Sequence, residues 1–159
     1  MKQETFSDIE YAHRKRKTRR DIFLETIDSL MPWDDWVRMI RPYYPSGRRG
    51  RPPRDIETML RMYLLMHLYS LSAESLEDAV YDSYAMRSFM HLDFLKEQVP
   101  GASTMLRFRH LLKDHGISDR ILQDVEEKLT GAGLKLSRGT LVDAAASPAR
   151  SALSPGRKS

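Results

Sequence analysis

The stretch from Arg54 to Tyr69 constrains the fold most, because its apolar residues cover almost every side of the helix that their spacing predicts. A helix with so little polar surface has to be enclosed by other parts of the chain. The residues expected to be enclosed are Ile56, Met59, Leu60, Met62, Tyr63, Leu64, Leu65, Met66 and Leu68. We therefore predict a domain built around one central helix, in which His67 is a hydrogen-bonded core residue and not a ligand.

Amphipathic spacing predicts the helices that surround this central one. They are expected within the ranges 20–32, 33–42, 71–92, 103–116 and 118–131. The range 71–92 contains a tight break, so it is expected to form two helices in the arrangement of a helix-turn-helix. The predicted fold class is therefore all-α, a compact multi-helix domain of the helix-turn-helix-like kind.

Small polar residues mark the expected starts of several of these helices. Ser72 is expected to cap the helix that follows it, and Ser118 the last helix of the domain. Either Ser103 or Thr104 is expected to cap the helix between them. In the first helix, the apolar stripe is expected to consist of Ile22, Phe23, Ile27 and Leu30.

After Gly133 the helical period ends and an alternating pattern begins. The segment "LKLSRGTLVDA" places Arg138 and Gly139 between two short extended pieces, which predicts a β-hairpin. The chain is therefore divided into an N-terminal arm at 1–20, a helical domain at 21–131, a hairpin at 132–144 and a disordered tail at 145–159.

Composition excludes several classes of protein. The 159 residues are 41% hydrophobic and 30% charged, which is typical of a folded domain with its own core. No apolar run approaches the length that crosses a bilayer, and without cysteine the chain has neither disulfides nor thiolate metal sites. We expect a cytoplasmic, nucleoid-associated protein with no membrane partner.

The positive charge is concentrated at the two ends of the chain. Residues 1–54 hold 13 Lys and Arg against 8 Asp and Glu, whereas residues 55–143 hold 10 against 14. The segment "HRKRKTRR" at 13–20 is the densest part, and its cations are Arg14, Lys15, Arg16, Lys17, Arg19 and Arg20. Such a basic arm is expected to neutralise DNA phosphates, and the alternative is a solvated, solubilising arm.

A second basic segment, "RRGRPPR" at 48–54, must be a loop because of its proline and glycine content. Its arginines are Arg48, Arg49, Arg51 and Arg54, and residues 49–52 read Arg-Gly-Arg-Pro. This tetrapeptide resembles the core of the AT-hook, which lays an extended Arg-Gly-Arg along a narrow minor groove. A proline-rich connection into the central helix explains the same residues.

A third basic group lies on the expected outer face of the helix at 103–115. It consists of Arg107, Arg109 and Lys113, with His110 beside them. Cations on an exposed helix suit contacts to the phosphates of double-stranded DNA, and they are also common on any solvated helix. Double-stranded DNA is therefore the predicted partner of the chain.

Asp143 stands where the second strand of the predicted hairpin ends. A carboxylate in that position is able to ligate Mg²⁺ for phosphoryl transfer, but such a site needs further carboxylates. Glu126 and Glu127 lie on an earlier helix and have no obvious way to complete the set. From the residues alone, Asp143 is at most one ligand of an incomplete metal site.

Several long stretches in a fixed order resemble the transposases of bacterial insertion sequences. They are "RKTRRDIFLETID", "RPYYPSGRRGRPPRDIETMLRMYLLMHLYSLSAESLEDAVYDS", "RHLLKDHGI" and "GTLVDA". The resemblance runs from about Lys17 to Ala144 and is nearest to the insertion sequence five family of DDE enzymes. It implies a helical N-terminal domain that binds terminal inverted repeats, followed by an RNase H-like catalytic domain that uses Mg²⁺. It also implies that Asp143 is the first of the three catalytic carboxylates.

The sequence departs from that family after Ala144, where it continues as "AASPARSALSPGRKS". This tail lacks isoleucine, valine and aromatic residues and does not supply the second Asp and the Glu. We therefore expect a truncated transposase that binds DNA without a cofactor, with 132–144 as a remnant hairpin of the catalytic domain. The alternatives are a regulator that occupies sites or forms mixed oligomers with itself or an intact transposase, and a decayed reading frame without a role.

Overall fold

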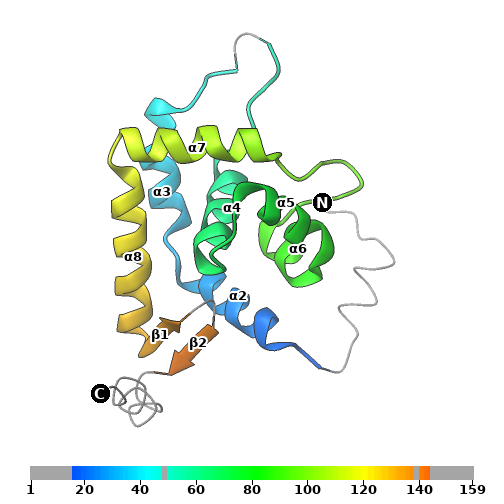
Figure 1. The fold of residues 1–159 in the computed structure, drawn as a ribbon. Helices are drawn as coiled ribbons and strands as arrows, with labels where there is room; N and C mark the ends of the chain where they lie inside the picture. The colour runs from blue at the N-terminus through cyan, green and yellow to red at the C-terminus, as the bar shows by residue number, and fades with distance from the viewer. Residues whose placement is uncertain (1–15, 48–49, 138–139, 144–159) are drawn as a thin grey trace, which may run out of the picture.

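The structure of the protein is a computed structural model that describes residues 16–47, 50–137 and 140–143 (Figure 1). Its elements in chain order are α2 (Arg19–Leu30), α3 (Trp33–Ile40), the 3-10 helix η1 (Arg41–Tyr43), α4 (Ile56–Leu68), α5 (Ala73–Asp82), α6 (Tyr84–Met90), α7 (Ala102–Asp114), α8 (Ile117–Gly131), β1 (Leu134–Ser137) and β2 (Thr140–Asp143). The prediction of a mostly helical chain is confirmed.

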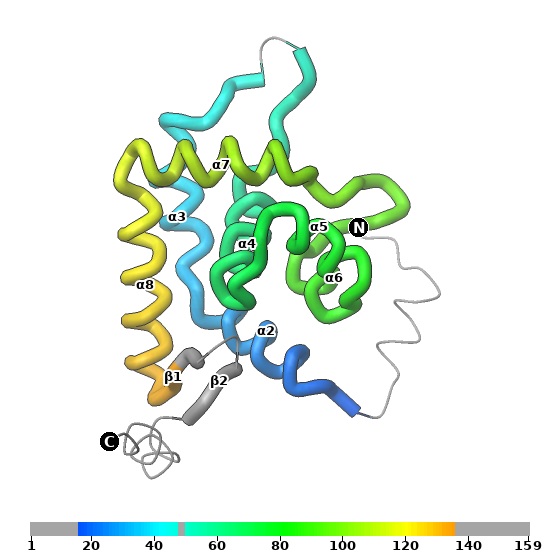
Figure 2. Tube along the Cα trace, viewed as in Figure 1, coloured from blue at the N-terminus to red at the C-terminus, as the bar shows by residue number. Residues whose placement is uncertain are grey.

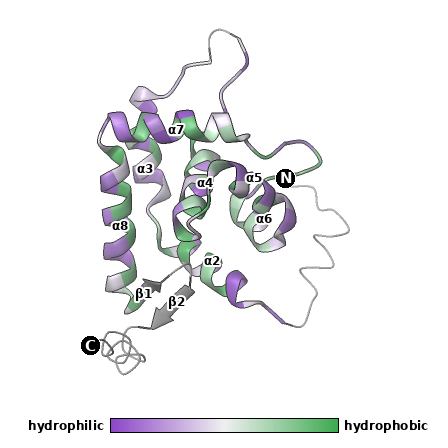
Figure 3. Ribbon diagram, in the orientation of Figure 1, coloured by the Kyte–Doolittle hydropathy of each residue, from purple (hydrophilic) through white to green (hydrophobic). Residues whose placement is uncertain are grey.

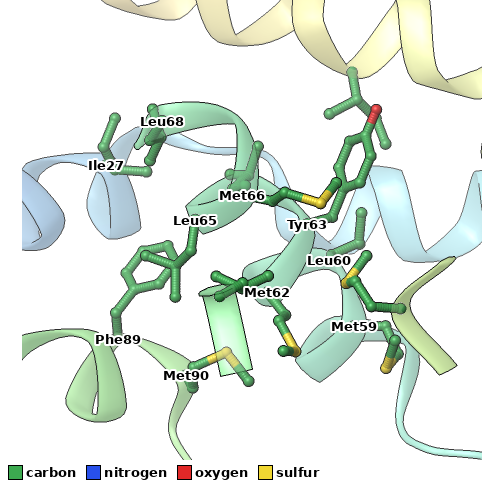
Figure 4. Packing of buried hydrophobic residues seen from close by; sticks show 14 of the residues in the cluster. Ile27, Met59, Leu60, Met62, Tyr63, Leu65, Met66, Leu68, Phe89 and Met90 are labelled. Carbon is green, nitrogen blue, oxygen red and sulfur yellow. The ribbon is translucent and has the colours of Figure 1, made fainter. Parts of the chain in front are cut away.

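Helix α4 occupies the centre of the molecule, with α3, α5, α6 and α7 packed around it (Figures 1 and 2). Every apolar residue predicted to be enclosed in this helix is buried, and Figure 4 shows their side chains pointing toward several different neighbours. In Figure 3 the outer helices carry both hydrophobic and hydrophilic bands, as expected where one face is buried and the other is exposed. The buried apolar side chains of α4 therefore form the centre of the hydrophobic core.

The polar residue that the core encloses in α4 is Arg61, and the prediction that His67 lies in the core is wrong. The Arg61 residue is only 2% exposed, whereas His67 belongs to the exposed residues at the end of the helix. The two positions lie on different sides of α4, because six residues turn a helix by about 240°. The helices that pack against α4 cover the side that carries Arg61 and leave the side that carries His67 exposed.

The Arg61 guanidinium contacts groups from its own helix and from three other helices. It donates to a carboxylate oxygen of Asp28 at 2.8 Å, to Glu57 at 2.9 Å and to the backbone carbonyl of Phe89 at 2.9 Å. The indole of Trp33 covers its face, with 4.2 Å between Cζ and the ring centroid. A buried cation requires partners of this kind, and here they connect α2, α3 and α6 to α4.

Helix α2 begins with a capping box that sets its position in the chain. The hydroxyl of Thr18 accepts from the backbone N–H of Asp21 at 3.1 Å, and the Asp21 carboxylate accepts from the backbone N–H of Thr18 at 2.8 Å. With this start, Leu24 faces the core, and Ile22, predicted to face inward, is 53% exposed. The two side chains lie on opposite sides because two residues turn the helix by about 200°.

The predicted pair of helices within 71–92 is confirmed as α5 and α6. The Ser72 hydroxyl caps α5 by accepting from the N–H of Ser75 at 3.1 Å, as predicted. The break is at Ser83, whose hydroxyl caps α6 by accepting from the N–H of Met86 at 3.2 Å. Two caps eleven residues apart in sequence therefore produce two short helices where one longer helix would otherwise continue.

The predicted caps of the last two helices are wrong. Gly101 occupies the N-cap position of α7, so Ser103 and Thr104 lie within its first turn. Helix α8 begins directly after Gly116, and Ser118 lies within the helix. Gly116 occupies the N-cap position of α8 with a φ of +68°, a conformation that glycine adopts without steric cost, and the chain turns there from α7 into α8.

The predicted hairpin is confirmed in the backbone. Strands β1 and β2 are antiparallel, with Leu134 opposite Asp143 and Ser137 opposite Thr140. The strands continue from the end of α8, and β2 also contacts α2. The predicted arm and tail lie largely outside the described residues, although Arg19 and Arg20 belong to the first turn of α2. No helix in the described part of the chain has the length and apolar character needed to span a membrane.

Candidate nucleic-acid interface

A groove of about 570 Å³ separates the 44–54 loop from α7. Tyr44, Arg51 and Arg54 line it on the loop side, and Arg107 and Phe108 line it on the helix side. The loop projects above α7 at the top of the view in Figure 1. The groove therefore lies between described residues of the 44–54 loop and helix α7.

Hydrogen bonds hold the loop in place against the helical body. The Tyr44 hydroxyl donates to the backbone carbonyl of Arg54 at 2.6 Å, and the Arg54 guanidinium donates to the backbone carbonyl of Gln98. The Tyr44 ring also packs edge-on against Phe108 of α7, with 6.2 Å between ring centroids. Both walls of the groove are thus attached to the core, and the groove exists before any ligand binds.

Gly47 determines the path of the loop. It has a φ of +76°, and a Cβ at this position would lie 3.0 Å from Cδ of Pro53. A side chain would therefore strain the backbone and also displace the proline. This close approach keeps the two ends of the loop together on the groove side.

Cations dominate the charged groups in the groove. Arg51, Arg54 and Arg107 line it, and Glu77 is the carboxylate among its described lining residues. Arg51 and Arg107 are exposed, and within the described residues no carboxylate pairs with either of them. Two basic segments that the sequence places far apart are therefore brought to one site, with two guanidinium groups available for an anion.

The basic residues of α7 do not share one face. Arg107 lines the groove, whereas Arg109 lies near Tyr63 and His67 on the other side of the helix. Lys113 follows one turn after Arg109 and is also exposed. The predicted exposure of all three cations is confirmed, but the structure adds only Arg107 to the groove.

The environment of His67 predicts a dependence of stability on pH. Although His67 is exposed, its imidazole packs edge-on against the Tyr63 ring, with 4.6 Å between centroids. This partial loss of hydration, followed by the positive charge of Arg109, lowers the pKa of His67 below its usual 6.5. The unfolded chain therefore takes up this proton at a higher pH than the folded chain, so stability is lost as the pH falls below about 6.5. Burial and the charge of Arg61 also lower the pKa of His91, which acts in the same direction.

We expect the free energy of unfolding in urea to decrease between about pH 7.5 and 5.5, and to decrease less in His67→Gln. The variant His110→Gln, which removes an exposed histidine of α7, serves as the control. Equal pH dependence in wild type and His67→Gln would contradict the assignment.

The described basic residues of the predicted arm lie apart from the groove. They are Arg16, Lys17, Arg19 and Arg20, at the start of α2 and at the opposite end of the molecule from the loop in Figure 1. Arg14 and Lys15 are outside the described residues, as are Arg48 and Arg49 of the loop. Residues 16–20 and the groove therefore do not form one surface.

Intramolecular contacts engage Lys17 and Arg20 of the arm. The Lys17 ammonium pairs with the Glu25 carboxylate at 2.9 Å. The Arg20 guanidinium lies over the ring of Tyr69, 4.9 Å from its centroid, and donates to the Ser83 hydroxyl at 3.4 Å. These contacts are on the surface and contribute little to stability, so a phosphate is able to replace them.

The minor-groove hypothesis concerns the Arg-Gly-Arg-Pro stretch at 49–52. Arg49 lies outside the described residues, so this hypothesis stays a prediction. Gly50 has a φ of +71°, a left-handed conformation that glycine adopts without steric cost. Arg51 lines the groove beside α7.

Asp143 is the last residue of β2, and its backbone pairs with Leu134. Among residues 16–47, 50–137 and 140–143, no three His, Asp or Glu side chains gather into a group that could hold a metal ion. Glu126 and Glu127 are exposed on α8. The described residues thus do not form a Mg²⁺ site.

Sequence reasoning missed the aromatic residues of the groove. Tyr44 and Tyr81 line it, and Tyr81 is 42% exposed. Tyr81 follows Val80, which is on the buried stripe of α5, so its position on the outer face of that helix was visible in the sequence. An exposed tyrosine outside the apolar stripe is the signal that would have singled it out.

Comparison with known proteins places the groove inside a domain that matches a known family. A protein-family model described as Transposase domain (DUF772) matches residues 11–111. The match extends from before α2 into α7 and includes all the described residues that line the groove. No solved structure matches the chain.

Proposed function

The chain belongs to the transposase domain family (DUF772), and from this premise we propose that its helical body binds double-stranded DNA along the groove between the 44–54 loop and α7. The observation that carries the proposal is the meeting of Arg51, Arg54 and Arg107 in one preformed groove. The DNA that we propose is the terminal inverted repeat of an insertion sequence, because the sequence resembles that family of transposases.

The three arginines have different tasks in this proposal. Arg54 already donates to the backbone carbonyl of Gln98, so it holds the loop and keeps its remaining N–H groups for a ligand. Arg51 and Arg107 are exposed and unpaired within the described residues, so each is able to contact a phosphate oxygen without first breaking an ion pair. A planar guanidinium binds phosphate through two parallel hydrogen bonds, which favours arginine at such a site.

The proposal is tested by fluorescence anisotropy with two labelled duplexes of equal length and composition, one carrying the terminal repeat of the element and one scrambled. We expect the logarithm of the binding constant to fall linearly with the logarithm of salt concentration, with a slope of roughly −3 for three phosphate contacts. The repeat is expected to bind at least about 10-fold more tightly than the scrambled duplex.

The outcomes separate the two parts of the proposal. No binding of either duplex at about 50 mM salt, where phosphate contacts are strong, would contradict DNA binding itself. Equal, salt-dependent binding of both duplexes would retain DNA binding and remove the assignment to terminal repeats.

A further inference from the structure

The lining of the groove includes apolar and aromatic residues as well as arginines. They are Met59, Val99 and Leu111 together with Phe108 and Tyr81, and Tyr81 is 42% exposed. A phosphate does not require such residues, because the guanidinium groups meet its charge. A flat aromatic group gains from them, because it buries apolar area and stacks on an aromatic ring.

The size of the groove points to a single small ligand. Its volume of about 570 Å³ lies within the range of roughly 300–1,000 Å³ that is typical of small-molecule sites. Stacked bases of an intact duplex cannot enter a pocket of this kind, whereas one unstacked nucleotide can. Such a nucleotide has both groups that this lining is able to bind, an anionic phosphate for the arginines and an aromatic base for the apolar and aromatic residues.

We propose that the groove holds one unpaired nucleotide of the bound DNA, with its phosphate on Arg51 and Arg107 and its base against Tyr81. This inference rests on the proposed DNA binding and deepens it. An unpaired nucleotide is preferred to one in a duplex, because no base pair has to be broken and little stacking is lost.

Tyr81 makes three contacts with neighbouring residues that restrain its position. Its hydroxyl accepts from the backbone N–H of Val99 at 3.4 Å, and its backbone carbonyl accepts from the Arg87 guanidinium at 3.1 Å. Its ring packs edge-on against Phe94, with 5.5 Å between centroids. The ring is therefore fixed in orientation while 42% of the residue stays exposed, which lowers the entropic cost of stacking a base on it.

The test compares three DNAs with the full chain: a blunt duplex, the same duplex with one bulged nucleotide, and the same duplex with an abasic bulge. We expect the bulged duplex to bind about 10-fold more tightly than the blunt one, the size expected for one base–aromatic stack. The abasic bulge is expected to lose that advantage, because it keeps the flexibility of the bulge but has no base.

Protein variants assign the effect to the ring. In Tyr81→Ala the ratio of bulged to blunt affinity is expected to fall to about one, whereas Tyr81→Phe, which keeps the ring, retains most of it. Tyr43→Ala is the matched control, since Tyr43 is also exposed but stacks on His115 outside the groove, at 3.8 Å between centroids. Circular dichroism confirms that each variant is folded before its ratio is used.

Two results would overturn the inference. Equal, salt-dependent binding of all three DNAs would remove the nucleotide pocket and leave the proposed function intact. A bulge preference that is unchanged in a folded Tyr81→Ala would place the unpaired base elsewhere on the protein. Absence of binding to every DNA would instead contradict the proposed function itself.

Discussion

Replacing Arg61 by methionine is expected to lower the free energy of unfolding by about 3 kcal/mol. The change leaves the carbonyl of Phe89 without its donor and removes the cation that Asp28 and Glu57 share. Losing one partner of a fully buried ion pair costs roughly 3–5 kcal/mol. The lower end applies here because the side chains of Asp28 and Glu57 are each 35% exposed and remain partly hydrated.

Urea unfolding followed by tryptophan fluorescence measures this effect. The control is Arg38→Met, which removes an exposed arginine that pairs with Asp35 on the surface of α3. Since exposed pairs contribute little, the control is expected to change stability by less than about 1 kcal/mol. Equal effects of the two substitutions would show that Arg61 does not connect α2 and α6 to the core.

Neutralising the groove with Arg51→Gln and Arg107→Gln together is expected to weaken duplex binding by about 10- to 100-fold at roughly 100 mM salt. It should also make the salt slope less steep by about 2, since each phosphate contact contributes nearly one to it. Arg54 is left unchanged because its guanidinium holds the loop to Gln98, and its loss would disturb the groove itself.

The matched control removes the same net charge from another surface. Arg120→Gln and Lys128→Gln together change two exposed cations of α8, which does not line the groove. We expect this variant to keep the wild-type salt slope within about 0.5. Equal losses of affinity in both double variants would mean that binding follows net charge, and the groove would then have no special part in it.

The residues of α4 show how much of the fold the sequence predicts and where that prediction ends. Apolar residues on every side of one helical segment required a covering layer, and all of them are buried. The polar residues of this helix did not follow the sequence-based expectation, since His67 is exposed and Arg61 is buried. The sequence shows that both lie on the same helix, but it does not show that Asp28 and Phe89 from two other helices meet the arginine.

Local rules also decided some helix boundaries and failed at others. Ser72 caps α5 as predicted, because the hydrogen bond of a cap involves only residues three positions apart. Ser118 does not cap α8, because the left-handed conformation of Gly116 turns the chain directly into that helix. The predicted caps were correct where the local hydrogen bond alone sets the start, and wrong where the connection between two packed helices sets it.

The sequence by itself determined the helical class, the central helix, the terminal hairpin and the identity of the basic residues. These depend on periodicity and composition, which are local properties of the chain. The tertiary structure alone decided that Arg51 and Arg54 share a groove with Arg107, while the cations at the start of α2 lie at the other end of the molecule. The physical reason is that the groove depends on contacts between residues far apart in sequence. Examples are the contact of Tyr44 with Phe108 and the hydrogen bond from Arg54 to Gln98. Such contacts form only when α7 packs across the core.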